Sequence, residues 1–536
     1  MSTRRISRHF KPRILRSTVL AGLGVAIGLA HPAHAMTYYA GDFTINLQST
    51  LGYNVGLRTA PVDYAMLSSN TDDGDRNFRT GVFENRVQTL EQLGISDGDY
   101  GLRASLQAWL DTPYLGRNKN NSPSTFNSYN VSSTGFPSAT VANEGRRIEM
   151  LAAFVYGAEH FDNGRQKLSW QIGRQTITWG QSLFTLSGIS GLQAPVDFYA
   201  AETLANPQAQ SLFLPTGAAQ VAYDFGNGVQ LMGYWQFEYE PDILPGVGSY
   251  FSSADIVGPG AQRILASPVV NGQAYSLFRG PDVRPPNGLD QYGLSAYAAF
   301  GQYNFGLYYV HAIPKTPGVE TYAPAFFAPT AQGLEVGQYR IYYAKPVDAY
   351  AASLSTVFDQ VNLASELSLR TGQPLLSTPS YGGAVSYNDP LYAEGTVMNF
   401  LVNGIYITPP LPVFTNGGTL EAELVLNDVL GVTKNKAALV AGHTRDGGSF
   451  DVAWTPQYFP RSDLEVDFPV SYNVNFQGDS EFSGLNAGTA TIDVGVKAIY
   501  KANFNFGITY QRYAGPPNRQ ANIDRDYAEL YFQKTF

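Results

Sequence analysis

Catalytic chemistry in this chain would have to rely on histidine, serine or carboxylate side chains, because the sequence contains no cysteine. A serine–histidine or aspartate–histidine hydrolase needs a histidine close to its nucleophile. After residue 35 the chain offers only His160, His311 and His443, each without a nearby serine motif. Scattered histidines without cysteine also make a poor zinc site. The sequence therefore predicts no enzymatic activity, no catalytic residues, no metal centre and no cofactor.

A short acidic stretch is the remaining candidate for metal chemistry. It contains Asp72, Asp73, Gly74 and Asp75. These carboxylates could contact a divalent cation or lipopolysaccharide, but their spacing does not match the calcium loop of a helix–loop–helix site. The sequence favours a solvated loop at this position.

The elements that would position functional side chains are β-strands. From Phe43 to Arg58 apolar and polar residues alternate, and this run is long for a strand of a soluble sandwich. The chain holds 35 Tyr, 31 Phe and 54 Gly, and its mean hydropathy is −0.16. After residue 35 no run approaches the about 18 apolar residues of a membrane-spanning helix. The pattern predicts an all-β protein, a single transmembrane antiparallel β-barrel.

Long loops and tight turns alternate along the predicted strands, as they do in barrels with long extracellular loops and short periplasmic turns. We count about eighteen strands, with sixteen as the alternative. The clearest expected connections are tight turns at Ser96–Asp99, Gly226–Gly228, Gly301–Gln302, Asp359–Gln360 and Gly431–Lys434, and long loops at Pro241–Leu289, Ile313–Val347 and Thr371–Gly418.

The last stretch, Asp526 to Phe536, places Ala528, Leu530 and Phe532 on one face and mostly polar residues on the other. A final strand with a terminal Phe resembles the closing strand of bacterial outer-membrane barrels, which pairs with the first strand. Such barrels need the barrel-assembly machinery and contact outer-membrane lipid and lipopolysaccharide. We therefore expect β-strand pairing between the two ends of the barrel.

Residues 1–35 read as a secretory signal peptide, with a basic start, a short apolar core and Ala33-His34-Ala35 at the cleavage site. The barrel would then span residues 36–536. Six of the 35 Lys and Arg lie in the signal and none of the 44 Asp and Glu does, so the exported part is strongly acidic. This balance argues against a nucleic-acid partner. The expected location is the outer membrane of a Gram-negative bacterium.

Polar residues at inward positions are candidates for lining an aqueous path, because the lipid-facing side of a barrel disfavours charge. The residues that we expect at the lumen or at a constriction are Arg58, Arg103, Gly173, Arg174, Gln175, Trp179, Gly180, Glu238, Glu366 and Arg370. Arg174 could pair with a luminal carboxylate. The alternative is that such charges pair with one another and only rigidify the interior.

The block Gly173–Gly180 ends a strand and is followed by Gln181–Gly217, which does not alternate and could contain a short helix. Its glycines would let the backbone bend inward, and its Leu and Phe side chains would be covered inside a wide barrel. We expect an inward-folded loop that acts as a gate. An outer cap, or a purely structural role for the block, is the alternative.

Three segments resemble a proteobacterial outer-membrane family known as domain of unknown function 1302. They are GRQTITWGQSLF (Gly173–Phe184), APVD (Ala194–Asp197) and YWQFEYEPDILPGVGSYFSSADIVGPG (Tyr234–Gly260). The family usually has Tyr where Leu110 stands and a more apolar closing strand. The resemblance implies an outer-membrane location, and work beside a periplasmic carrier and an RND-type inner-membrane pump. It implies no catalytic residues.

The predicted function is an outer-membrane channel or transport protein for hydrophobic or amphipathic molecules. Apolar residues such as Leu183, Phe184 and Leu186 among polar ones favour such a substrate over ions. Two alternatives stay open: a general porin-like diffusion channel, and a structural or adhesive surface protein that the barrel anchors. The sequence does not name the substrate, its direction of movement or the oligomeric state.

Overall fold

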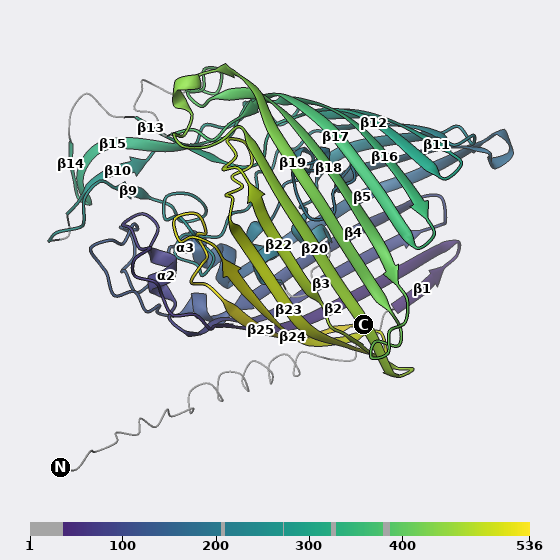
Figure 1. The fold of residues 1–536 in the computed structure, drawn as a ribbon, viewed down its shortest axis with the longest axis horizontal. Helices are drawn as coiled ribbons and strands as arrows, with labels where there is room; N and C mark the ends of the chain where they lie inside the picture. Colours follow the sequence, from purple (N-terminus) through teal and green to yellow (C-terminus); the bar gives the residue numbers. More distant parts are fainter. Residues whose placement is uncertain (1–35, 205–208, 272, 323–327, 379–385) are drawn as a thin grey trace, which may run out of the picture.

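The described residues form a closed barrel of eighteen antiparallel strands (Figure 1). The computed structural model describes residues 36–204, 209–271, 273–322, 328–378 and 386–536. The predicted signal peptide lies outside these residues and stays a prediction. The all-β barrel and the count of eighteen strands are confirmed.

The barrel strands follow one another round the wall in chain order. They are β2 (Phe43–Arg58), β3 (Gly81–Ser96), β4 (Gly101–Asp111), β5 (Arg146–Phe161), β6 (Gln166–Gln175), β7 (Thr216–Asp224), β8 (Val229–Gln236), β11 (Tyr292–Phe300), β12 (Tyr303–Ala312), β16 (Val347–Phe358), β17 (Val361–Pro374), β18 (Glu394–Thr408), β19 (Gly418–Lys434), β20 (Asp446–Arg461), β22 (Val470–Gln477), β23 (Thr489–Tyr500), β24 (Phe504–Ala514) and β25 (Tyr527–Thr535). Short β21 (Leu464–Asp467) lies between β20 and β23, as β22 does, and the two make one interrupted strand. β1 (Met36–Ala40) forms a hairpin on the start of β2.

The two ends of the barrel sheet pair as the closing strand predicts. β25 runs antiparallel to β2 from Thr535 opposite Thr50 to Tyr527 opposite Arg58. Beyond the strand, the Phe536 N–H donates to the Ser49 carbonyl at 2.8 Å. This ladder removes both free edges, so every wall strand has a partner on each side.

Tight turns gather at one end of the barrel and long loops at the other, as expected. One pair of expected connections is wrong, however. β18 lies inside the expected long loop Thr371–Gly418, and β19 runs through the expected turn at Gly431–Lys434. The actual turn between them is at 409–417. Proline and glycine on both sides of β18 make this stretch resemble a loop in the sequence. The prediction omitted β18 but divided β19 and the residues after it into two strands, so the total strand count stayed correct.

The wall has an apolar outer face and a polar inner face. On β17, Leu367 and Leu369 are 49% and 36% exposed, whereas the alternating Glu366, Ser368 and Arg370 are buried. Within the described chain, no helix has the length and apolar character to cross a bilayer.

The long loops carry their own structure. β9 (Arg263–Leu265), β10 (Tyr275–Arg279), β13 (Gly318–Tyr322), β14 (Ala328–Thr330) and β15 (Gly333–Tyr342) form a second sheet that projects beyond the barrel rim (Figure 1). The helical turns are α2 (Asp73–Asn77), η1 (Thr112–Leu115), α3 (Ser138–Thr140), η2 (Val141–Gly145), η3 (Asp162–Gly164), η4 (Ile189–Leu192), α4 (Phe198–Thr203), α5 (Ala209–Leu212) and η5 (Lys436–Ala438). Those at η4, α4 and α5 lie in the connection from β6 to β7, where we expected a short helix.

Candidate functional site

The chain leaves the wall at the end of β6 and crosses the interior before it returns as β7. We call this connection, residues 176–215, the luminal segment; its residues 205–208 are not described. Trp179 anchors its first part by packing edge-on against Tyr234 of β8, with ring centroids 4.8 Å apart. The side-chain carbonyl of Gln193 accepts from the Trp179 N–H at 2.5 Å. The root of the segment is therefore buried against the inner wall beside β6.

Two carboxylates on the opposite wall hold the segment by its backbone. Glu423 of β19 accepts from the N–H groups of Leu183, Phe184 and Thr185 at 2.6, 3.2 and 3.1 Å. Glu366 of β17 accepts from the Gln181 N–H at 3.0 Å and the Ile189 N–H at 2.7 Å. β19 lies eight strands round the barrel from β6, so the segment spans the interior. Hydrogen bonds to an ionised acceptor are about twice as strong as neutral ones.

Two donors from the same wall complete this attachment. Arg370 follows Glu366 and Ser368 on the inner face of β17. It donates to the carbonyls of Ser187 and Gly188 at 2.7 and 2.5 Å. Asn403 of β18 donates to the Gln181 carbonyl at 2.5 Å. The wall thus matches both the N–H and the C=O groups of a non-repetitive backbone, which could not otherwise be buried without a large cost.

The second half of the segment returns to the wall near its starting point. Asp197 caps α4 by accepting from the Ala200 N–H at 2.8 Å, and it pairs with Arg147 of β5 at 2.6 Å. At the far end of α4, Arg86 of β3 donates to the Thr203 side chain at 2.9 Å. Arg86 is fully buried and ion-paired with Glu84 at 2.6 Å.

Five of the ten residues that we expected at the lumen or constriction belong to this site. Glu366 and Arg370 bind the luminal segment directly, and Trp179 lies at its root. Gly180 has φ +113°, and a Cβ there would lie 2.7 Å from a Glu366 carboxylate oxygen, so this position needs glycine. Gln175, the last residue of β6, is buried and donates to the Ala218 carbonyl at 2.9 Å.

The other five lie near the ends of wall strands. Gly173, with φ +133°, sits within β6 two residues before its end. Arg174 shares the strand face of Ile172, which is 49% exposed, so it lies on the outer face and not in the lumen. It pairs with Glu238 at 2.6 Å where β6 and β8 end, and it donates to the carbonyl of Pro215, the last residue of the luminal segment, at 3.1 Å. Arg103 is exposed near the tight-turn end of β4, away from the segment.

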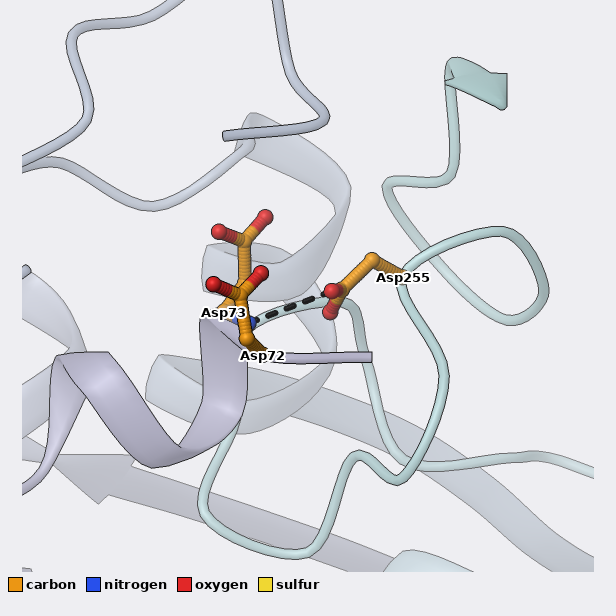
Figure 2. Close-up of side chains that lie close together, drawn as sticks. All are labelled: Asp72, Asp73 and Asp255. Atoms are coloured by element: carbon orange, nitrogen blue, oxygen red, sulfur yellow. Dashed lines mark hydrogen bonds between the residues drawn. The ribbon is translucent and has the colours of Figure 1, made fainter. Parts of the chain in front are cut away.

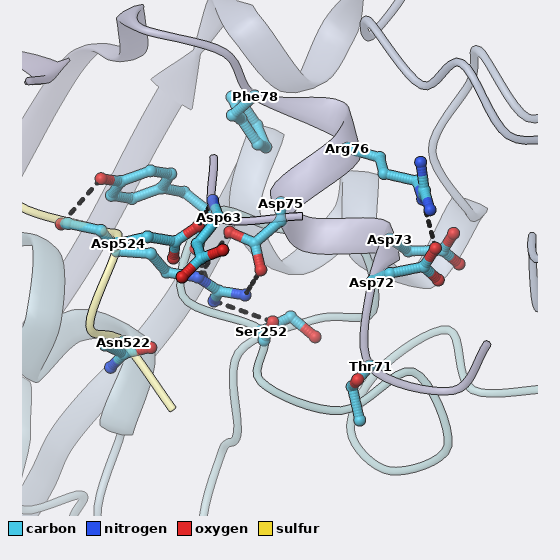
Figure 3. Close-up of polar contacts among 12 residues, drawn as sticks. Asp63, Thr71, Asp72, Asp73, Asp75, Arg76, Phe78, Ser252, Asn522 and Asp524 are labelled. Atoms are coloured by element: carbon cyan, nitrogen blue, oxygen red, sulfur yellow. Dashed lines mark hydrogen bonds and ion pairs between the residues drawn. The ribbon is translucent and has the colours of Figure 1, made fainter. Parts of the chain in front are cut away.

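Arg58 forms ion pairs with residues of two loops and does not contact the luminal segment in the described structure. It pairs with Asp75 at 3.2 Å and Asp524 at 2.8 Å, and Arg525 pairs with the same Asp75 at 2.9 Å. Figure 3 shows Asp75, Asp524 and Ser252 close together. Arg525 also donates to the Ser252 carbonyl at 2.9 Å. This network ties the loops after β2, β8 and β24 to one another at the barrel rim.

The acidic stretch is buried, so the expectation of a solvated loop is wrong. Asp72 and Asp73 lie at the start of α2 beside Asp255 of the β8–β11 loop, and one carboxylate oxygen of each lies within 4.8 Å of the others (Figure 2). Asp72 pairs with Arg76, and Asp255 accepts from the Asp73 N–H at 3.1 Å. Sequence spacing could not show this, because the third carboxylate comes from a distant loop.

Burial and mutual repulsion change the ionisation of these acids. Burial raises the pKa of Asp255 to about 7, and burial together with the negative charge of Asp255 raises the pKa of Asp73 well above its usual value. A proton on one of the two relieves the repulsion without an ion. The three aspartates therefore stabilise the contact between the loop after β2 and the β8–β11 loop.

The three histidines lie at strand ends or in a loop. His160 of β5 lies 3.3 Å from Asp99, and His311 of β12 lies 2.8 Å from Asp348 and 3.4 Å from Asp290. His443 lies in the loop between β19 and β20. These are polar contacts of the rim and turns, and the absence of an enzymatic role stays a prediction.

Comparison with family models gives a match over residues 16–536 to the family described as "Protein of unknown function (DUF1302)". The chain belongs to this family. Comparison with curated proteins gives no significant match.

Solved structures with similar folds include three outer-membrane proteins. OmpF of Salmonella typhi, in complex with daunomycin, is 9% identical with a TM-score of 0.38; 94% of this chain and 100% of that one are covered. Acinetobacter baumannii OccAB1 is 8% identical with a TM-score of 0.43, over 93% and 97% of the two chains. A BenF-like porin from Pseudomonas fluorescens Pf-5 is 10% identical with a TM-score of 0.43, over 93% and 100%.

Sequence reasoning missed several residues of the site. Glu423 was not singled out, although it alternates with Ala422 and Leu424 on a strand with an apolar outer face. Asn403 was missed because β18 was assigned to a loop. Arg86 was also missed, although its inward position follows from the alternation of β3. A fully placed set of strands would have found all three as inward polar residues.

Proposed function

We propose that the protein is an outer-membrane channel of a Gram-negative bacterium in which the luminal segment narrows the path. The observation that carries the proposal is the attachment of this segment to the opposite wall through Glu366, Arg370 and Glu423. A barrel that served only as an anchor would not need a backbone crossing matched in this way to inward side chains.

The location is supported by the outer face of the barrel. Large apolar side chains that would be costly in water are exposed along successive strands, including Leu294 at 61%, Leu307 at 49% and Tyr350 at 52%. A closed barrel satisfies its backbone hydrogen bonds internally, as a bilayer requires. The long loops would face outward and the tight turns the periplasm.

The substrates that we propose are hydrophobic or amphipathic molecules. The luminal segment presents Leu183 and Phe184, 40% and 39% exposed, within a polar-walled interior. A general porin would need no such apolar side chains along its path. We further propose that the channel works with a periplasmic carrier and an RND-type pump at the tight-turn side. Loss of uptake in cells without the pump, with the current of the purified protein unchanged, would support that coupling.

The test of the channel is the current carried by the purified protein in planar bilayers, after two checks of the barrel. The folded protein should migrate differently on a gel from the boiled one and should fractionate with outer membranes. We expect discrete single-channel steps smaller than those of a wide, unobstructed barrel. A folded protein that passes no current and no solute is an anchor for surface loops. A large current without discrimination between solutes would indicate a general porin.

A further inference from the structure

A cavity of about 640 Å³ lies on the long-loop side of the luminal segment. The segment supplies its floor, and the connections after β12, β17 and β22 supply its walls. Its apolar surface comes from Leu186, Leu192, Val196, Phe198, Leu375 and Phe482. This volume is within the range of sites for drug-sized ligands.

Two buried cations line this cavity. Arg370 is 3% exposed; its guanidinium lies 5.2 Å from the Phe482 ring centroid, and its Nε has no hydrogen-bond partner. Lys315, in the connection after β12, is 4% exposed, and its ammonium lies 4.9 Å from the Tyr239 ring centroid and donates to the Gln291 side chain. Within the described chain neither cation forms an ion pair.

One carboxylate also lines the cavity, and it is already satisfied. Asp242 accepts from the Val196 N–H at 2.8 Å and from the Thr316 hydroxyl at 2.7 Å. The cavity therefore carries two cations against one anion, in a chain whose net charge is −9. Burial lowers the pKa of Lys315 to about 7, although the nearby carboxylates of Asp242 and Glu240 oppose this shift.

We propose that this cavity binds an amphipathic organic anion, with a carboxylate head directed to Arg370 and Lys315 and an apolar body over the luminal segment. This inference rests on the proposed function and names the substrate class of the same site. A carboxylate would give the Arg370 Nε the acceptor that it lacks and would offset two desolvated positive charges. The apolar residues would gain by covering the body of the ligand.

The test compares three probes with the same chain: octanoate, 1-octanol and octylammonium. Each is titrated onto the full-length protein in lipid nanodiscs, with empty nanodiscs as the blank, and binding is followed by ligand-observed NMR. We expect octanoate to bind at least about tenfold more tightly than octanol, because only the anion makes charge-assisted contacts. Octylammonium should bind most weakly. Equal or tighter binding of octanol or octylammonium would overturn the proposal.

The variants are Lys315→Gln and Arg370→Gln, each first checked for heat-modifiable migration. Each should weaken octanoate binding about tenfold and leave octanol unchanged. Because Arg370 also holds the luminal segment, Lys315→Gln decides the result. Lys345→Gln is the matched control, since Lys345 lies on the same side of the barrel but donates to the Asn388 carbonyl outside the cavity. Unchanged octanoate binding in Lys315→Gln, or an equal loss in Lys345→Gln, would overturn the assignment.

Binding in nanodiscs requires no current, so the two proposals can fail separately. If octanoate binds as expected but the protein passes no current, the channel proposal is rejected and the anion site is retained. If the protein passes current but binds octanoate and octanol equally, the channel proposal is retained and the anion site is rejected.

Discussion

Two long connections leave neighbouring parts of the wall, and one folds inward while the other folds outward. The luminal segment (residues 176–215) hydrogen-bonds through its backbone to Glu366 and Glu423 across the interior. The β8–β11 connection (residues 237–291) contributes β9 and β10 to the outer sheet and packs Leu277 against Tyr339 and Ile341. Neither shows strand alternation in the sequence.

The two connections differ in the hydrogen-bond partners that are available to their backbone N–H and C=O groups. The inward connection is matched by carboxylates, a guanidinium and an amide on the facing wall, whereas the outward one joins the outer sheet and bonds to other loops, as the Ser252 carbonyl does to Arg525. The loop sequence alone does not decide the direction, because both connections contain apolar residues that need covering. The inward polar residues of strands far along the chain decide it.

The largest effect should come from shortening the two connections by equal lengths. Replacing Leu183–Ser190 with two glycines removes the three amides that bind Glu423 and one of the two that bind Glu366, so the single-channel current should rise severalfold and larger solutes should pass. Replacing Pro281–Gly288 in the outer connection in the same way should leave the current nearly unchanged. Equal currents from the two folded variants would mean that the inward connection does not narrow the path.

A smaller but clear difference is expected in stability. Arg86→Gln leaves Glu84 buried without its partner beside α4, and such a loss costs about 3–5 kcal/mol. Arg279→Gln removes an outer pair with Asp282, whose side chains are partly exposed, and should cost about 0–1 kcal/mol. Urea unfolding followed by tryptophan fluorescence measures both. Comparable losses would show that the interior contacts contribute no more than those of the loops.

The outer loops should show a pH dependence of opposite direction to that of an ordinary carboxylate ion pair. The folded state raises the pKa of Asp255 to about 7, so the loop packing is most stable in acid and loses stability as pH rises through about 7. Limited proteolysis should therefore cut these loops faster at about pH 8 than at about pH 5. Asp255→Asn should remove most of this dependence, and Asp282→Asn should not. Unchanged pH dependence in Asp255→Asn would exclude this acid as its source.

The wall was predictable because side chains repeat every two residues along a strand: β2 has the bounds expected from alternation. β18 was missed because proline and glycine flank it. Of the residues expected at the lumen, Glu366, Arg370 and Gly180 lie at the luminal segment, whereas Arg174 lies at the end of β6, where it pairs with Glu238. Gly180 lies against Glu366, which is far from it in the sequence. Such a contact depends on how the barrel closes, and a local sequence pattern does not contain that information.

The central claim is that wall carboxylates hold the luminal segment across the path. The most direct test is the single-channel current of Glu423→Gln against Glu421→Gln. Both residues lie on the inner face of β19, but within the described chain only Glu423 binds the segment. A neutral amide loses the charge that strengthens these three hydrogen bonds, so Glu423→Gln should give a larger, flickering current, while Glu421→Gln should resemble the unmodified protein. Indistinguishable currents from both variants and the unmodified protein would contradict the account.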